Sequence, residues 1–276
     1  MMRYKFCAFA DEADKSIDGQ IEAMLANGIG YLEIRGVDGE NISKITAEKA
    51  KEVREKLDAN GIAVWSVGSP YGKMKITDDF SVHLDKFRHG LELAHILGAE
   101  HMRIFSFRVP AEEAEHYADT VMEWLDDFRS AAKGSGITLC HENEKGIYGD
   151  TADRCVKIHK AFPDIKAVFD PANFIQCGVD TKEAWEKLST YVEYMHIKDA
   201  MPEGKVVPAG KGIGNLPWLL ERYKGEVLTL EPHLSVFKGL EALEADEKTI
   251  IDEFKYPSAR AAFDAAVIAL KEIIER

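Results

Sequence analysis

The sequence predicts a (β/α)₈ barrel, because three features recur along its 276 residues. Short apolar runs of strand character alternate with helical runs, several helical runs end at a glycine, and eight strand candidates fit the length. Strands and helices that alternate with short loops give parallel strands joined by right-handed crossovers. Eight such units match a closed barrel, so one domain is expected over residues 1–276.

The strands are expected at the apolar runs that follow the helical segments. The helical run 21–26 ends at Asn27-Gly28 and leads into YLEIR, and Asn60-Gly61 precedes IAVWSV in the same way. Glycine directly after a helical run is typical of a helix end. The eight strands are predicted at residues 4–9, 31–35, 62–67, 101–107, 137–142, 165–170, 192–198 and 226–231. An amphipathic helix that begins with a proline is predicted at about 257–275.

An open, doubly wound sheet is the alternative arrangement of the same elements. Such a sheet should carry a glycine-rich turn after its first strand. Here that position reads AFADE, over residues 8–12, without a glycine. No linker or low-complexity segment divides the chain, so the single barrel is favoured.

The composition narrows the class of protein. The net charge of −13 argues against a nucleic-acid partner, since phosphate binding depends on a basic face. No apolar run approaches the roughly 20 residues that span a bilayer, and the start of the chain lacks a signal-peptide core. The four cysteines are scattered, without a CxxC pair, as expected for free thiols. A cytoplasmic protein without a membrane partner is therefore expected, and a homo-oligomer is left open.

The last four predicted strands share one feature at the end where a barrel carries its chemistry. Each ends in, or carries, an ionisable side chain: Glu142, Asp170, His196 and Glu231. Side chains alternate with a period of two along a strand. Where Leu228 and Leu230 face the helices, Glu231 faces the interior, and the same reasoning turns the other three inward. All four are therefore expected to point into the mouth of the barrel.

Four such side chains favour a metal site. Three carboxylates that converge without a cation would repel one another and shift one another's pKa values. Three oxygen ligands with one imidazole suit Mn²⁺ or Mg²⁺, with Co²⁺ or Zn²⁺ as substitutes. The pattern predicts one divalent metal ion. The alternative for any one of these residues is an ordinary charge at a strand end.

The strand ends HENE, FDPAN, MHIKD and LEP, in this order, resemble the xylose isomerase-like superfamily of sugar (phosphate) isomerases and epimerases. The resemblance covers nearly the whole chain, and the superfamily also contains apurinic-site endonucleases. It implies that Glu142, Asp170, His196 and Glu231 bind one divalent metal. It also implies that Glu142 and Glu231 act as the acid–base pair on opposite faces of a sugar or cyclitol.

Two positions depart from the pattern of many relatives, which have histidines near the substrate. This chain has Glu144 and Asn173 there, and both are expected close to the substrate. The extra carboxylate of Glu144 should disfavour an anionic substrate. A neutral sugar, ketose or cyclitol is therefore expected, with a sugar phosphate as the alternative if Lys198 and Lys211 supply a phosphate site on the opposite rim.

Three further residues are candidates for substrate binding. Lys198 is predicted to face inward, with a lysine reaching solvent as the alternative. Lys211 lies in VPAGKGIGN, which forms either a lid over the substrate or a plain flexible loop. Glu33 is expected to bind a sugar hydroxyl or to make a structural bond. His141 is expected to be a packing histidine, facing the helices.

Four functions compete. The leading one is a metal-dependent sugar isomerase or epimerase that works through a metal-stabilised enediolate. The second is a lyase of the inosose or dehydroshikimate dehydratase type, in which the enolate expels a β-hydroxyl. An apurinic-site endonuclease needs three zinc ions and further histidines at strand ends that this chain lacks. A non-catalytic sugar-binding module is the fourth.

Overall fold

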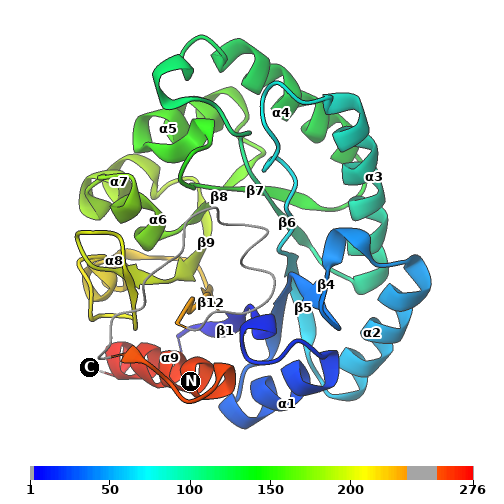
Figure 1. Cartoon of the computed structure of the whole chain (residues 1–276), viewed down its shortest axis with the longest axis vertical. Helices are drawn as coiled ribbons and strands as arrows, with labels where there is room; N and C mark the ends of the chain where they lie inside the picture. The colour runs from blue at the N-terminus through cyan, green and yellow to red at the C-terminus, as the bar shows by residue number, and fades with distance from the viewer. Residues whose placement is uncertain (1–2, 235–253, 276) are drawn as a thin grey trace.

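A closed barrel of parallel strands forms the centre of the computed structural model, which describes residues 3–234 and 254–275 (Figure 1). The order around the barrel is β1-β2-β5-β6-β7-β8-β9-β12, and β12 pairs with β1 to close it. The strands are β1 (Lys5–Ala8), β2 (Tyr31–Ile34), β5 (Ala63–Val67), β6 (His101–Ile104), β7 (Thr138–Glu142), β8 (Lys166–Phe169), β9 (Val192–Ile197) and β12 (Val227–Leu230). The predicted barrel is confirmed, and the open sheet is excluded because the two edges pair.

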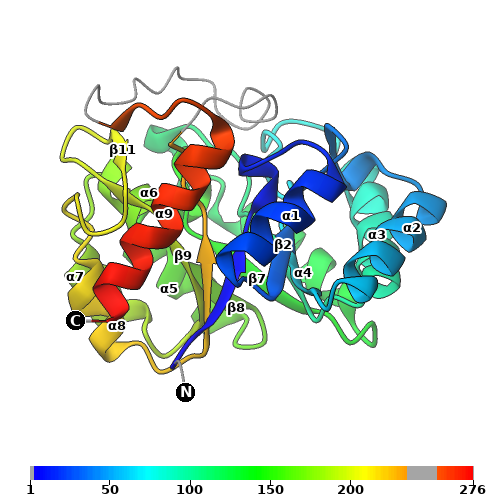
Figure 2. The same ribbon diagram turned by 90° about the horizontal axis from the view of Figure 1, so that it is seen from below.

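Helices surround the strands as an outer ring (Figure 1). They are α1 (Ile17–Asn27), α2 (Ala47–Ala59), α3 (Phe80–Leu97), α4 (Ala118–Ala132), α5 (Ala152–Ala161), α6 (Pro171–Gln176), α7 (Thr181–Leu188), α8 (Leu216–Arg222) and α9 (Ala259–Ile274). Gly28 ends α1 with a positive φ of 70°, the conformation glycine adopts most readily. The side chain of Ser258 caps α9, so Pro257 precedes the helix and does not begin it. Figure 2 shows α9 beside α1.

Short elements decorate the loops that follow the strands. Two small antiparallel pairs form, β3 (Gly36–Val37) with β4 (Glu40–Asn41) and β10 (Asp199–Ala200) with β11 (Val206–Val207). The 3₁₀ turns are η1 (Ala10–Glu12), η2 (Ile42–Lys44), η3 (Ala111–Glu113) and η4 (Tyr148–Asp150). All of these lie in strand-to-helix loops, the side on which a barrel of this kind builds its site. In the described ranges, no helix is both long and apolar enough to cross a membrane.

The core has two parts, one between strands and helices and one inside the barrel. The inner part is a cluster of buried side chains: Cys7, Cys140, Val168, Tyr194 and Val227. Cys140, Val168 and Tyr194 stand two positions before Glu142, Asp170 and His196 in the sequence, so they share their inward direction. This apolar layer closes the barrel below the polar residues at its mouth.

Candidate metal centre

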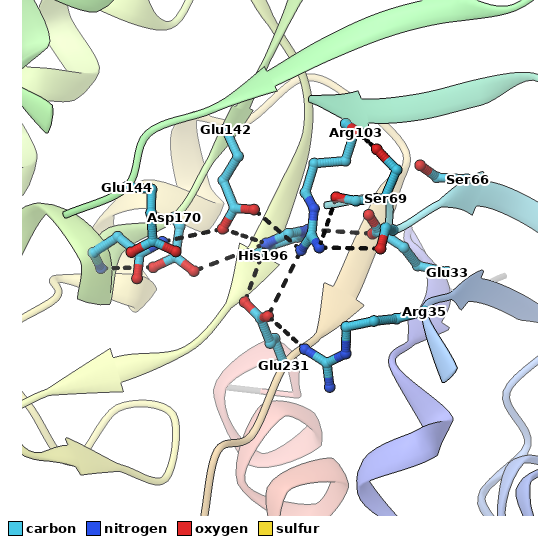
Figure 3. A network of polar contacts seen from close by, with 12 residues as sticks. Glu33, Arg35, Ser66, Ser69, Arg103, Glu142, Glu144, Asp170, His196 and Glu231 are labelled. Carbon is cyan, nitrogen blue, oxygen red and sulfur yellow. Dashed lines mark hydrogen bonds and ion pairs between the residues drawn. The ribbon is translucent and has the colours of Figure 1, made fainter. Parts of the chain in front are cut away.

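Glu142, Asp170, His196 and Glu231 come together at the mouth of the barrel (Figure 3). All four are buried, and one potential ligand atom of each lies within 4.8 Å of those of the other three. His196 Nδ1 is 3.1 Å from Glu142 Oε1, 3.3 Å from Glu231 Oε2 and 3.8 Å from Asp170 Oδ2. Three carboxylates therefore surround one ring nitrogen, a donor set that suits a divalent cation.

The ends of β7 and β8 are fixed to each other by an amide. Asn143 Nδ2 donates to the carbonyl oxygen of Asp170 at 2.9 Å, and the Asp170 N–H donates back to Asn143 Oδ1 at 3.0 Å. Asp170 also caps α6, because its carboxylate accepts from the Asn173 N–H at 2.8 Å. Asn143 was not predicted from the sequence. Its two bonds set the positions of Glu142, which precedes it, and of Asp170.

A carboxylate behind His196 sets the direction of its ring. Glu33 Oε2 lies 3.2 Å from His196 Nε2, and Glu33 Oε1 accepts from the Tyr194 hydroxyl at 2.8 Å. A histidine that donates its far N–H to a carboxylate presents the other nitrogen to a metal. Burial alone would lower the pKa of His196, but Glu142 and Glu33 hold it well above its usual range. Glu33 therefore orients a candidate ligand, and both of its oxygens are engaged by the protein.

Lys198 lies inside the cluster and does not reach solvent. Its Nζ is 3.0 Å from both Asp170 Oδ2 and Glu231 Oε2, and its side chain is buried. Burial would lower the pKa of this amine, but Asp170 and Glu231 keep it well above the usual range. The inward direction predicted for Lys198 is therefore observed, with the ammonium group among the carboxylates.

Two buried arginines flank the glutamates, and sequence reasoning missed both as site residues. Arg103 Nη1 lies 3.2 Å from Glu142 Oε2, and Arg35 Nη1 lies 3.1 Å from Glu231 Oε1. Arg35 also pairs with carboxylates of the loop after β1. The signal was present in the alternation of side chains. Arg35 stands two residues after Glu33, which faces inward. Arg103 stands between Met102 and Ile104, which face the helices, so it also faces inward.

Two acids of the cluster resist ionisation. Burial, together with the neighbouring Glu231, raises the pKa of Asp170 to about 7, against the opposing effect of Lys198. Burial also raises the pKa of Glu12 to about 8, although Arg35 opposes this. A divalent cation beside Asp170 would favour its charged form, as bound metals do for their ligands.

The charges of the network fit one divalent cation. Counted for a metal-loaded state, in which His196 would be a neutral ligand, and with Glu12 protonated and His233 neutral, the described residues contribute six carboxylates: Asp11, Glu33, Glu142, Glu144, Asp170 and Glu231. They contribute four cations: Arg35, Lys73, Arg103 and Lys198. The two excess negative charges equal the charge of one divalent ion. Burying unpaired charge is costly, so the donor set and the charge balance both fit such an ion.

A second close group shares one of these carboxylates. Glu12, Glu231 and His233 also bring potential ligand atoms within 4.8 Å of one another. Arg35 donates to Glu12 Oε1 at 3.1 Å and to Glu231 Oε1 at 3.1 Å. An arginine therefore already supplies a positive charge to this second group.

The two departures from the family pattern lie beside Glu142, in different roles. Asn173 Nδ2 donates to Glu142 Oε1 at 3.1 Å, which helps to orient that carboxylate. Glu144 Oε2 lies 2.8 Å from Lys73 Nζ. Burial would raise the pKa of Glu144, but Lys73 and Lys198 lower it to about 2. The charge of Glu144 is therefore compensated within the protein.

Lys211 is exposed, in a loop that is anchored by a single carboxylate. Asp199 accepts from the N–H groups of Gly210 and Gly212 through Oδ2, and from Gly214 and Ala200 through Oδ1. A Cβ on Gly212 would lie 2.3 Å from the Ala200 carbonyl oxygen, so this approach requires glycine. Three glycine N–H groups of this loop are thus held by one side chain, Asp199.

His141 packs as expected. It is buried, its Nε2 lies 2.9 Å from Ser106 Oγ, and its ring lies 5.8 Å from that of His159. It takes no part in the cluster at the barrel mouth.

The fold and this donor set define a (β/α)₈ barrel protein with a candidate centre for one divalent cation. Residues 21–256 match the family model described as "Xylose isomerase-like TIM barrel". The chain belongs to this family. No curated protein matches the sequence.

Several solved structures share the fold at low sequence identity. The probable 3-DHS dehydratase AsbF of Bacillus anthracis has a TM-score of 0.70 and 15% identity, covering 98% of this chain and 99% of that chain. D-psicose 3-epimerase of Clostridium cellulolyticum H10, solved with D-tagatose, has a TM-score of 0.69 and 15% identity, covering 97% of each chain. A xylose isomerase-like TIM barrel protein of Mycobacterium smegmatis, in complex with magnesium, has a TM-score of 0.69 and 15% identity, covering 100% of this chain and 97% of that chain.

Proposed function

We propose that the protein is a divalent-metal-dependent isomerase or epimerase of a sugar or cyclitol. One observation carries the proposal. Glu142 and Glu231 each turn one oxygen towards His196 Nδ1, at 3.1 and 3.3 Å, while the second oxygen of each faces an arginine. Two carboxylates can thus serve as ligands and still keep an oxygen for proton transfer.

The reaction moves a hydrogen beside a carbonyl group. When bound, the metal supplies Lewis-acid stabilisation of the charge that develops on the substrate oxygens, an effect of several kcal/mol. Glu142, Asp170, His196 and Glu231 would hold it. One of the two glutamates takes the proton from carbon, and an acid–base group in this position contributes roughly 10²–10⁴-fold in rate. Return of a proton from the other glutamate gives an epimer, and return to the neighbouring carbon gives an isomer.

The substrate in this proposal is neutral. One divalent ion balances the network of buried charges, so an anionic substrate would add an unpaired negative charge to a buried site. Glu144 no longer carries this argument by itself, because Lys73 compensates its charge.

A lyase is the second candidate. The similarity of the fold to a probable dehydratase, over 98% of this chain, supports it. In this reaction the enolate expels a β-hydroxyl group as water after the same proton abstraction. The buried ammonium of Lys198, 3.0 Å from Glu231, is placed to protonate such a leaving group. An endonuclease is not proposed. The described residues form two groups of potential metal ligands, and both groups include Glu231. Two groups that share a ligand do not suit three zinc ions.

The test is hydrogen exchange without a chosen substrate. The protein, loaded with Mn²⁺, is incubated in D₂O with a pool of neutral ketoses and cyclitols that carry a ketone, and products are read by mass spectrometry and NMR. Deuterium beside a carbonyl with no loss of water supports the isomerase or epimerase. Loss of water supports the lyase, and the absence of exchange with every compound contradicts both. Glu142→Gln is the control that removes one proton carrier.

A further inference from the structure

The two glutamates divide their oxygens in the same way. In Glu142, Oε1 lies near His196 and accepts from Asn173, while Oε2 faces Arg103 at 3.2 Å. In Glu231, Oε2 faces His196 and Lys198, while Oε1 faces Arg35 at 3.1 Å. The same Oε1 lies 3.9 Å from Arg103 Nη1. We call Glu142 Oε2 and Glu231 Oε1 the outer oxygens, because each glutamate turns its other oxygen towards His196. Arg103 lies within 4 Å of both outer oxygens.

Arg103 is held in place by groups other than the glutamates. Its Nη2 donates to the carbonyl oxygens of Gly68 and Ser69, at 3.1 and 3.3 Å, in the loop after β5. Its guanidinium lies over the rings of Phe9 and Phe105, at 5.0 and 4.9 Å from their centroids. The side chain is 3% exposed. A planar cation fixed by backbone and aromatic rings is a firm reference point for a carboxylate.

We propose that Arg103 is a positioning residue that keeps the outer oxygens of Glu142 and Glu231 away from the metal and available to the substrate. The inference rests on the proposed function. A carboxylate beside a divalent cation can turn both oxygens towards it, and it then lacks an oxygen for proton transfer. The ion pair at Oε2 of Glu142 opposes that rotation by charge attraction. This oxygen accepts no hydrogen bond from the residues that the structure describes, so its lone pairs are available for proton transfer.

The proton inventory of the reaction uses the outer oxygens. The C–H bond beside the carbonyl breaks, its electron pair forms the carbon–carbon double bond of the enediolate, and the proton moves to one outer oxygen. In epimerisation the other glutamate must enter the step protonated. It gives that proton from its outer oxygen to the opposite face of the same carbon, and the first glutamate keeps the proton it removed until the product leaves. Arg103 lies 3.2 Å from the outer oxygen of Glu142 and 3.9 Å from that of Glu231, which Arg35 holds at 3.1 Å. Loss of Arg103 should therefore impair transfer by Glu142 most.

The experiment compares Arg103→Met with wild type in three measurements: Mn²⁺ affinity by calorimetry, kcat and KM on the ketose identified in D₂O, and deuterium exchange. We expect kcat to fall by about 100-fold, the usual size of a misplaced catalytic group, while KM and the Mn²⁺ dissociation constant stay within about threefold, since no ligand or substrate contact is lost. Arg103→Lys keeps the charge without the forked geometry of the guanidinium, so its kcat should lie between those of wild type and Arg103→Met. It also serves if Arg103→Met does not fold.

Arg154→Met is the matched control. It removes an arginine from a part-buried ion pair with Asp150, at a position that contacts neither glutamate, and kcat should stay at the wild-type level. A parallel loss of Mn²⁺ affinity and kcat in Arg103→Met would overturn the proposal, because the arginine would then only support the metal ligands. Unchanged kcat would overturn it as well. If wild type turns over no ketose or cyclitol, the proposed function fails. The inference then falls with it. An active wild type together with an unchanged kcat in Arg103→Met overturns the inference alone.

Discussion

Replacement of His159 by glutamine should make the protein less sensitive to acid. His159 lies in α5 and is 1% exposed, with Nδ1 3.0 Å from the carbonyl oxygen of Ile165. Its Nε2 has no hydrogen-bond partner among the residues that the structure describes. Protonation would place a charged N–H in an apolar site without an acceptor. Burial accordingly lowers the pKa of His159 to about 4, against the opposing effect of the Ile165 carbonyl.

The sign and the size follow from linkage between protonation and unfolding. Above the unfolded-state pKa of about 6.5, both states are neutral and His159 has no effect on stability. As the pH falls from there to about 4, the unfolded state binds a proton that the folded state does not, so the free energy of unfolding decreases. A gap of about 2.5 pKa units corresponds to about 3 kcal/mol. His141, whose pKa burial also lowers, should act in the same direction.

The assay is urea unfolding, followed by circular dichroism, at a series of pH values from about 7 to about 4. Wild type should lose about 3 kcal/mol more stability over this range than His159→Gln, whose amide can still donate to the Ile165 carbonyl. His116→Gln, at an exposed position, is the control. Parallel stability curves for wild type and His159→Gln would refute the reasoning, whatever their offset at neutral pH.

Three further predictions concern the metal centre. Mn²⁺ at about 100 times its dissociation constant should stabilise wild type by about 2.7 kcal/mol in thermal unfolding. Asp170→Ala should lose both this stabilisation and the bound metal. Equal stabilisation of the variant would place the metal elsewhere. Glu142→Gln and Glu231→Gln should each lower kcat by roughly 10²–10⁴-fold with an unchanged far-UV spectrum, and a variant that keeps most of its activity would move the proton carrier to another residue. Wild type should prefer a neutral ketose to its phosphate ester in kcat/KM, and Glu144→His should weaken that preference, since it leaves Lys73 without its carboxylate; a wild-type preference for the ester would contradict the charge balance.

The sequence by itself determined the barrel and the direction of its strand-end side chains. Period-two alternation is a local property of the backbone, so Glu142, Asp170, His196 and Glu231 could be turned inward from their immediate neighbours. The order of the strands then brings neighbouring ends together, because parallel strands in a barrel follow one another in the chain. Local rules were sufficient for these four residues.

Only the tertiary structure decided how the charges of the site are paired. Arg35 and Glu231 are 196 residues apart, and Lys73 meets Glu144 across 71 residues. Such contacts depend on the paths of loops and on side-chain rotamers, which no local period encodes. Reasoning from the sequence therefore left Glu144 with an unpaired negative charge and Glu33 with either a sugar hydroxyl or a structural bond. In the structure, Lys73 neutralises the first and His196 engages the second, because a buried charge is stable only beside a partner.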